Sequence, residues 1–212
     1  MNAGKYIFGQ LVSFLPKRVF DGIVKRHEGD KWVKHFTCWN QLLVIMFGQL
    51  AGCDSLREVA AIIDAIKSKS YHLGFGSGDI KLSDLSYANA NRDYKIFEEF
   101  ACHMINLARA RESQGCSFSM ASSTRSILCM SLFEWAYFRK TKGGIKLHTL
   151  FDVVIQIPTC IHITEAKFHD MNAMDEIPCE LNAFYIFDKG YYDLARLYRI
   201  QSIGSMFILL LN

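Results

Sequence analysis

A single acidic residue closes a short apolar run late in the chain. In the segment AFYIFDKGYYD, Asp188 follows Phe, Tyr, Ile and Phe. An acid at the end of a buried strand is costly unless a cation or a hydrogen-bond donor meets it. Metal-dependent phosphoryl chemistry needs several such acids to converge. Because aspartate and glycine also favour tight turns, the DKG sequence is equally suited to a turn.

Basic residues that could contact phosphates lie mainly in the first half of the chain. Residues 1–110 carry 14 Lys and Arg against 11 Asp and Glu, whereas residues 111–212 carry 10 of each, and the net charge is only +3. The candidate contacts are Lys17, Arg18, Lys25, Arg26, Lys31, Lys34 and Arg92. A later segment, FRKTKGG, adds Arg139, Lys140 and Lys142. For both groups, an ordinary solvated surface is the alternative to contact with a nucleic-acid backbone.

The cysteines and the apolar runs indicate the cellular compartment. The seven cysteines are odd in number and contain no C-x-x-C pair, which favours free thiols in a reducing cytoplasm over a disulfide framework or a zinc site. The longest apolar runs, LLVIMF and FILLL, are too short to cross a bilayer. The first residues lack the layout of a signal peptide. We therefore expect a cytoplasmic protein without a membrane partner.

The elements of the first half are predicted to be helices. SLREVAAIIDAIKS begins with Ser55 and places Glu58 three residues later, which is the pattern of a capping box. CWNQLLVIMFGQLAGC predicts a more fully buried helix, and NRDYKIFEEFACHMINLARARE predicts a long amphipathic one. A short helix is expected to begin at Ser83 or Asp84. Residues 1–113 are thus predicted to form a helical domain that could bind DNA.

The second half changes to strand patterns. CSFSMASS, GGIKLHTLFDVV and TCIHITEA predict three successive strands, and helices and strands then alternate to give the order β-β-β-α-β-α-β. Such an order predicts a mixed sheet with helices on its faces over residues 114–212. Phosphate-loop, G-x-S-x-G and H-E-x-x-H motifs are absent from the sequence.

Several segments together resemble a known family. SSTRSILCMSLFEWAYFRKTKGGIKLHTLFDVV, HDMNAMDEI and FYIFDKGYYD, in this order, resemble bacterial DDE-type transposases of the insertion sequence 4 family. HFTCWNQLLVIMFGQLAGCDSLREV and LSDLSYANANRDYKIFEEFA resemble the small N-terminal domain of a Bacteroides-like branch of that family. The resemblance implies a ribonuclease H-like fold. It also implies cleavage and strand transfer of DNA by an Asp–Asp–Glu triad that holds two Mg²⁺ ions.

Only part of that triad is recognisable. Asp188 matches the second acid, whereas the position of the first acid is Ser122, followed by Ser123 and Thr124 of the usual S-T. The glutamate motif of the family is missing from the sequence, which reads as truncated before it. One carboxylate cannot offset the charge of two divalent ions. We therefore expect Asp188 to be an ancestral metal ligand, with no Mg²⁺ bound productively.

Three functions remain open at this point. The chain is expected to be a transposase-family protein for DNA transposition that is catalytically inactive as it stands. Alternatively, its first domain is a DNA-binding remnant that competes with an intact transposase for the element ends, or the chain is a non-functional decayed fragment. The expected partners are DNA, a further copy of the chain and an intact transposase. The run FILLL is expected to form a strand with one face only partly covered, which would promote association.

Overall fold

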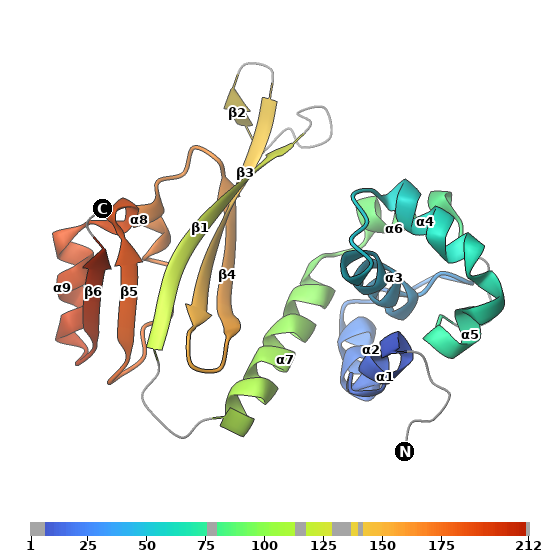
Figure 1. The fold of residues 1–212 in the computed structure, drawn as a ribbon, viewed down its shortest axis with the longest axis horizontal. Coiled ribbons are helices and arrows are strands. Elements are labelled where there is room, and N and C mark those ends of the chain that lie inside the picture. Colours follow the sequence, from blue (N-terminus) through green and yellow to red (C-terminus); the bar gives the residue numbers. More distant parts are fainter. Residues whose placement is uncertain (1–6, 76–79, 113–117, 129–136, 140–141, 211–212) are drawn as a thin grey trace. The chain divides into compact units, whose positions relative to one another are not determined.

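The computed structural model describes residues 7–75, 80–112, 118–128, 137–139 and 142–210. Within these residues the chain divides into two compact units, residues 1–103 and 104–212, and the division falls inside helix α7 (Lys95–Glu112) (Figure 1). The described helices include none that is long and apolar enough to cross a membrane.

The first unit consists of helices joined by short connections. They are α1 (Ile7–Ser13), α2 (Lys17–Arg26), α3 (Cys38–Leu50), α4 (Leu56–Ala65), the 3₁₀ turn η1 (Lys67–Lys69), α5 (Ser70–Leu73), α6 (Leu82–Asn91) and the start of α7. Leu43 and Val44 of α3 are fully buried and pack with Phe8, Phe75 and Leu85. This packing agrees with the prediction that CWNQLLVIMFGQLAGC forms a buried helix.

Of the two predicted helix starts, the one at Ser55 has a side-chain cap and the one at Ser83 or Asp84 does not. The Ser55 hydroxyl accepts a hydrogen bond from the Glu58 amide at 3.2 Å, and the Glu58 carboxylate accepts one from the Asp54 amide at 2.9 Å. The carboxylate thus reaches one residue further back than in the usual capping box. Helix α6 begins at Leu82, before the predicted Ser83 or Asp84, and it has no side-chain cap.

The second unit contains a mixed sheet with helices, as the sequence predicted. Its elements are β1 (Phe118–Leu128), β2 (Tyr137–Arg139), β3 (Lys142–Asp152), β4 (Ile157–Glu165), α8 (Asp170–Ala173), β5 (Phe184–Asp188), the 3₁₀ turn η2 (Lys189–Tyr191), α9 (Leu194–Ser202) and β6 (Met206–Leu210). β3 pairs with β1, β4 and β2 in antiparallel fashion. β5 pairs in parallel with β1 on one side and with β6 on the other. The predicted β-β-β-α-β-α-β order is therefore present, with the short β2 added.

The two faces of the sheet differ in what covers them. On one face, α8 and α9 enclose an apolar cluster that contains Tyr185 and Phe187 of β5 and Leu197 and Ile200 of α9. On the other face, Met206, Ile208 and Leu210 of β6 are 61%, 48% and 46% exposed. Phe207 and Leu209, which alternate with them, pack against the covered cluster. The prediction of a strand with one partly covered face is therefore confirmed for the described residues 206–210.

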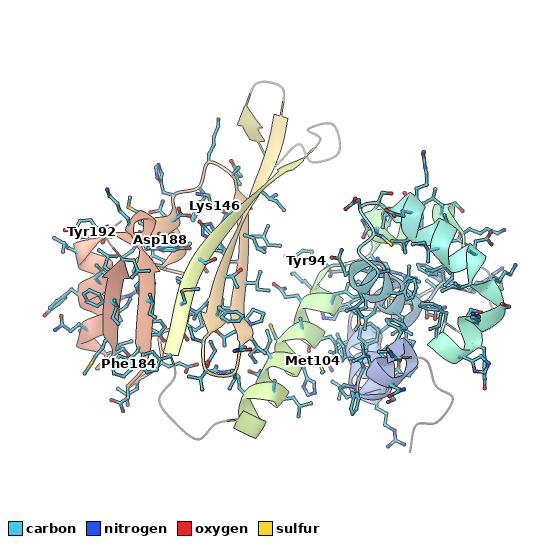
Figure 2. All side chains as sticks on the ribbon, viewed as in Figure 1. Tyr94, Met104, Lys146, Phe184, Asp188 and Tyr192 are labelled. Atoms are coloured by element: carbon cyan, nitrogen blue, oxygen red, sulfur yellow. The ribbon has the colours of Figure 1, made fainter. Side chains whose placement is uncertain are left out.

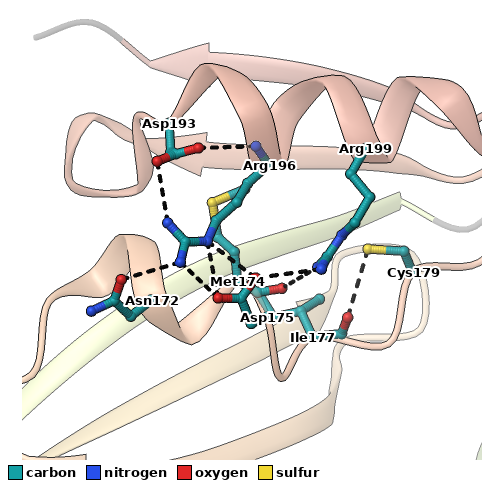
Figure 3. A network of polar contacts seen from close by, with 8 residues as sticks. All are labelled: Asn172, Met174, Asp175, Ile177, Cys179, Asp193, Arg196 and Arg199. Carbon is teal, nitrogen blue, oxygen red and sulfur yellow. Dashed lines mark hydrogen bonds and ion pairs between the residues drawn. The ribbon is translucent and has the colours of Figure 1, made fainter.

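Ion pairs hold α9 against the segment that follows α8 (Figure 3). The Arg196 guanidinium donates to Asp175 at 2.7 Å, to Asn172 at 3.2 Å and to Asp193 at 3.2 Å. The hydrogen bond from Arg196 is the main reason why the pKa of Asp175 lies below its usual value. Because Asp175 is largely exposed, this network fixes the position of α9 more than it adds to stability.

Local hydrogen bonds explain where the structure departs from the predicted elements. The sequence predicted a strand through Val154, but β3 ends at Asp152, whose carboxylate accepts from the amides of Val154 and Ile155 at 2.9 and 3.2 Å. This turn buries Asp152 almost completely. Of the seven cysteines, the structure describes five, and all five are free thiols.

Candidate functional site

The two positions singled out in the second unit lie on adjacent strands. β1 and β5 pair in parallel, with Ser119 opposite Tyr185 and Met120 opposite Ile186. Continuing this register by two residues brings Ser122 level with Asp188, at the carboxyl end of β5 (Figure 2). Ser122 is partly buried, and Asp188 is exposed. Such a register would place a hydroxyl-bearing residue level with a carboxylate-bearing one.

Asp188 also serves a local structural purpose. It occupies the N-cap position of η2, and its Oδ1 accepts a hydrogen bond from the Gly190 amide at 2.8 Å. This is the turn chemistry that the DKG sequence allowed. One lone pair of the carboxylate is thereby used, while the exposed side chain leaves the remaining oxygen accessible to solvent.

A second acid lies beside Asp188, and the sequence analysis did not single it out. A Cβ placed on Gly190 would lie 3.0 Å from both Asp170 Oδ2 and Asp188 Oδ1, so the two carboxylates flank the same glycine. Asp170 begins α8, immediately after His169. The available signal was an acid just after the strand TCIHITEA, but only the pairing of distant strands shows that it approaches Asp188.

A neighbouring lysine already neutralises the charge of Asp170. Lys146 Nζ, almost completely buried, lies 3.1 Å from Asp170 Oδ1 and donates to the Phe168 carbonyl oxygen at 2.8 Å. His148 Nδ1 lies 3.5 Å from the same carboxylate oxygen and 3.4 Å from the Tyr191 hydroxyl. We call these side chains the internal cluster; its members are Lys146, His148, Asp170 and Tyr191. The cluster lies on the covered face of the sheet, and Figure 2 labels Lys146 on β3.

Burial controls the protonation of this cluster. His148 Nε2 lies 3.0 Å from the Thr164 hydroxyl, and the ring is almost fully enclosed. Desolvation lowers the pKa of His148, against an opposing effect from Asp170. Desolvation, together with Asp170 and Asp188, raises the pKa of the Tyr191 hydroxyl far above its usual value. Both groups are therefore neutral near pH 7, and they suit a packed core.

These residues do not fit a site for two Mg²⁺ ions. A pair of Mg²⁺ ions needs several carboxylates to offset its charge, but the residue expected level with Asp188 is the neutral Ser122, and Asp170 is paired with Lys146. In the part of the chain that the structure describes, no three His, Cys, Asp or Glu side chains gather around one point. Asp152, a further acid near the end of a strand, is buried in its turn, and Glu134 lies outside the described residues.

The basic candidates of the first unit divide into paired and exposed residues. Lys17 lies 2.8 Å from Asp21 and sits over the Trp39 ring, and Arg26 forms an ion pair with Glu99. Arg18 and Lys25 on α2 are exposed. The later basic segment gives less information, because Lys140 lies outside the described residues. Arg139 and Lys142 form a pair between β2 and β3, and only their backbone is described.

Arg92, predicted as a basic candidate, has a largely buried side chain. Its side chain is only 9% exposed. The guanidinium donates to the Gln41 side chain at 2.9 Å and to the Phe36 carbonyl oxygen, and it lies 3.7 Å from Asp30. These partners occupy most of its donors. Arg92 therefore holds the connection between α2 and α3 in place, and it also lines a surface pocket beside that connection.

That connection, residues 27–37, borders a surface pocket of the first unit, and we call it the Trp32 loop. Trp32 at its tip is 91% exposed, which is unusual for so large an apolar side chain. The loop borders a pocket of about 610 Å³ whose other wall includes Tyr87 and Asn91 of α6. Lys31 and Lys34 of this loop were predicted from the sequence as basic candidates, but the tryptophan between them was not.

Two similarities to known proteins are informative. Residues 3–76 match a family model described as a domain of unknown function, DUF4372. The chain is also 32% identical over 108 residues to a protein of Sinorhizobium fredii named "Putative transposase y4zB". That alignment covers 50% of this chain and 30% of the relative, so the chain spans less than a third of the protein it matches. The match supports a relationship to transposase-family proteins.

Proposed function

We propose that this chain is a DNA-binding protein of the transposase type, that its helical unit carries the DNA contacts, and that its sheet unit does not cleave DNA as it stands. The similarity to the Sinorhizobium protein is the observation that carries the first part. The parallel pairing of β1 with β5 supports the second, because its register, continued by two residues, makes Ser122 the neighbour of Asp188, and a ribonuclease H-like DDE site would need an acid at both positions.

The finer assignment rests on the sequence motifs. The insertion sequence 4 family places its first two acids on adjacent parallel strands, which is how β1 and β5 are paired here. In that reading Asp188 is the second acid of the triad and Ser122 replaces the first. The DNA partner is then the ends of the element, and an intact transposase is the protein with which this chain would compete.

The packing of the helical unit favours the competitor function over the alternative of a non-functional fragment. It has a buried apolar core, α3 and α4 have side-chain caps, and the Trp32 loop is fixed by a buried arginine. A decayed chain would not be expected to retain a buried cation with three partners, because losing any partner leaves an unpaired charge.

DNA binding can be tested with the full chain and a labelled duplex. We expect weak binding that falls steeply between about 50 and about 200 mM salt, because each phosphate contact releases counterions. Arg18→Glu, on the exposed side of α2, should weaken binding and flatten the salt dependence. Arg57→Glu, which changes an equally exposed arginine on α4, is the matched control. Failure of the unmodified chain to bind at low salt would contradict the proposal.

A further inference from the structure

Trp32 combines full exposure with a constrained backbone. Its φ is +65°, in the left-handed region that bulky residues rarely adopt. Glu28, four residues earlier in the same loop, also has a positive φ of +51°. Trp39, only seven residues later, is partly buried, with its ring 5.3 Å from that of Phe20. A tryptophan held in a strained conformation and directed to solvent indicates a functional constraint, because such strain persists only where the surroundings impose it.

The surroundings of the Trp32 loop impose its conformation at several points. Asp30 Oδ1 accepts a hydrogen bond from the Cys38 amide at 2.7 Å, and Arg92 binds the Phe36 carbonyl oxygen. A Cβ on Gly29 would clash with the Ile96 and Cys38 side chains, so the loop backbone lies directly on the core. The loop is thus fixed before any ligand arrives, which reduces the entropy lost on binding.

The pocket beside Trp32 has the size and lining of a site for a planar polar ring. Its volume of about 610 Å³ lies within the usual range for small-ligand pockets, about 300–1,000 Å³. Trp32 and Tyr87 both line it, and Tyr87 is 72% exposed. Two exposed aromatic side chains, one from the loop and one from α6, therefore border the same space. Aromatic faces of this kind bind nucleobases by stacking.

The two sides of the pocket carry different charges, so one side suits a phosphate and the other suits a base. Lys31 and Lys34 flank Trp32 in the sequence and are exposed, although Lys31 is paired with Glu28 at 2.7 Å. The α6 side of the pocket instead carries the Asp84 carboxylate and the Asn91 amide, followed by Arg92, whose guanidinium is bound to Gln41 and the Phe36 carbonyl oxygen. The Asp84 carboxylate would repel a phosphate. The amino groups on the edge of a nucleobase could donate to both side chains.

We propose that the Trp32 loop binds an unpaired nucleobase by stacking on Trp32, with Lys34 contacting the adjacent phosphate. The substrate class is single-stranded DNA, or duplex DNA that contains unpaired bases. In a fully paired duplex the faces of the bases are covered by their neighbours, so only an unpaired base can offer its face to an indole. This inference rests on the proposed function, because it assigns the kind of DNA that the helical unit prefers.

The preference can be measured by fluorescence anisotropy with the full chain. The probes are a labelled paired duplex, the same duplex with several unpaired bases at its centre, and the corresponding single strand. We expect tighter binding to the second and third probes. Trp32→Ala should weaken binding to them by roughly tenfold, which is within the effect of losing one stacked base, and should change duplex binding less than about twofold. Trp32→Phe should retain most of the preference.

Controls separate this inference from the proposed function. Tyr71→Ala removes another exposed aromatic side chain of the same unit and should change no probe. If the unmodified chain binds the paired duplex but Trp32→Ala affects all three probes equally, or none of them, the stacking proposal is wrong and the proposed function stands. If no probe binds at low salt, both are wrong. Loss of self-association in Trp32→Ala without a change in DNA binding would instead identify a protein-docking surface and would overturn the stacking proposal.

Discussion

The two units use their polar and aromatic side chains in opposite ways. In the helical unit, the buried Arg92 fixes a loop whose tip presents Trp32 and Lys34 to solvent. In the sheet unit, Lys146 and Asp170 neutralise each other inside, while apolar side chains of β6 face outward. Polar and aromatic residues therefore form a surface for ligands only where their neighbours direct them outward. The helical unit has such a surface, whereas the polar groups of the sheet unit mostly support the fold.

The largest expected effect concerns the two faces of the sheet. Leu209→Lys should destabilise the protein by about 3–5 kcal/mol, because it directs a charge into the covered cluster. Ile208→Lys, one residue earlier on the open face, should change the free energy of unfolding by less than about 1 kcal/mol and should reduce association of the chain. Urea unfolding and light scattering of the two variants test this. Equal destabilisation by both would show that the faces are assigned wrongly.

A smaller effect is expected when the anchor of the Trp32 loop is removed. Arg92→Met leaves the Gln41 side chain, the Phe36 carbonyl oxygen and Asp30 without their cation, which should cost about 3 kcal/mol. Binding to DNA with unpaired bases should also weaken, because the loop is no longer fixed. Chemical denaturation and anisotropy measure the two effects. Lys95→Met, at an exposed position at the start of α7, is the control and should change neither quantity.

The smallest expected effect is a pH dependence that arises in the sheet unit. Because burial lowers the pKa of His148, the unfolded chain takes up a proton at this residue more readily than the folded protein does. The stability that neutral His148 provides is therefore complete above its ordinary pKa of 6.5 and declines as the pH falls towards the lower pKa of the folded state. His148→Gln should show less decline in its urea midpoint between about pH 7.5 and about pH 5.5.

The exposed His35 provides the control for this pH dependence. His35→Gln should keep the pH profile of the unmodified protein. An unchanged profile in His148→Gln would show that the internal cluster of the sheet unit does not respond to protons.

Local patterns predicted most of the elements but few of the contacts between them. The strands around Ser122, Leu147, Ile163 and Asp188 follow from runs of apolar and β-branched residues, and the capping box at Ser55 follows from spacing alone. The burial of Arg92 could not be predicted, because Phe36 and Gln41 lie 56 and 51 residues away in the sequence. The approach of Asp170 to Asp188 depends in the same way on strand pairing.

The role of Trp32 shows a different limit of sequence reasoning. HEGDKWVKHF reads as a charged connection, and nothing in its local pattern distinguishes an exposed tryptophan from a buried one such as Trp39. The exposure of Trp32 follows from its backbone φ and from the packing of Gly29 against Ile96. Both depend on the three-dimensional arrangement. A tryptophan flanked by lysines in a turn-rich segment was the one available signal.

The most direct test of the central claim measures binding and cleavage in one experiment. The full chain is incubated at low salt with DNA taken from either side of its gene, in Mg²⁺ and separately in Mn²⁺, and the DNA is analysed on native and denaturing gels. We predict a retarded complex and intact strands, because the helical unit binds while Asp188 lacks a second acid at Ser122. Metal-dependent nicking that disappears in Asp188→Ala would contradict the claim, and so would the absence of any complex.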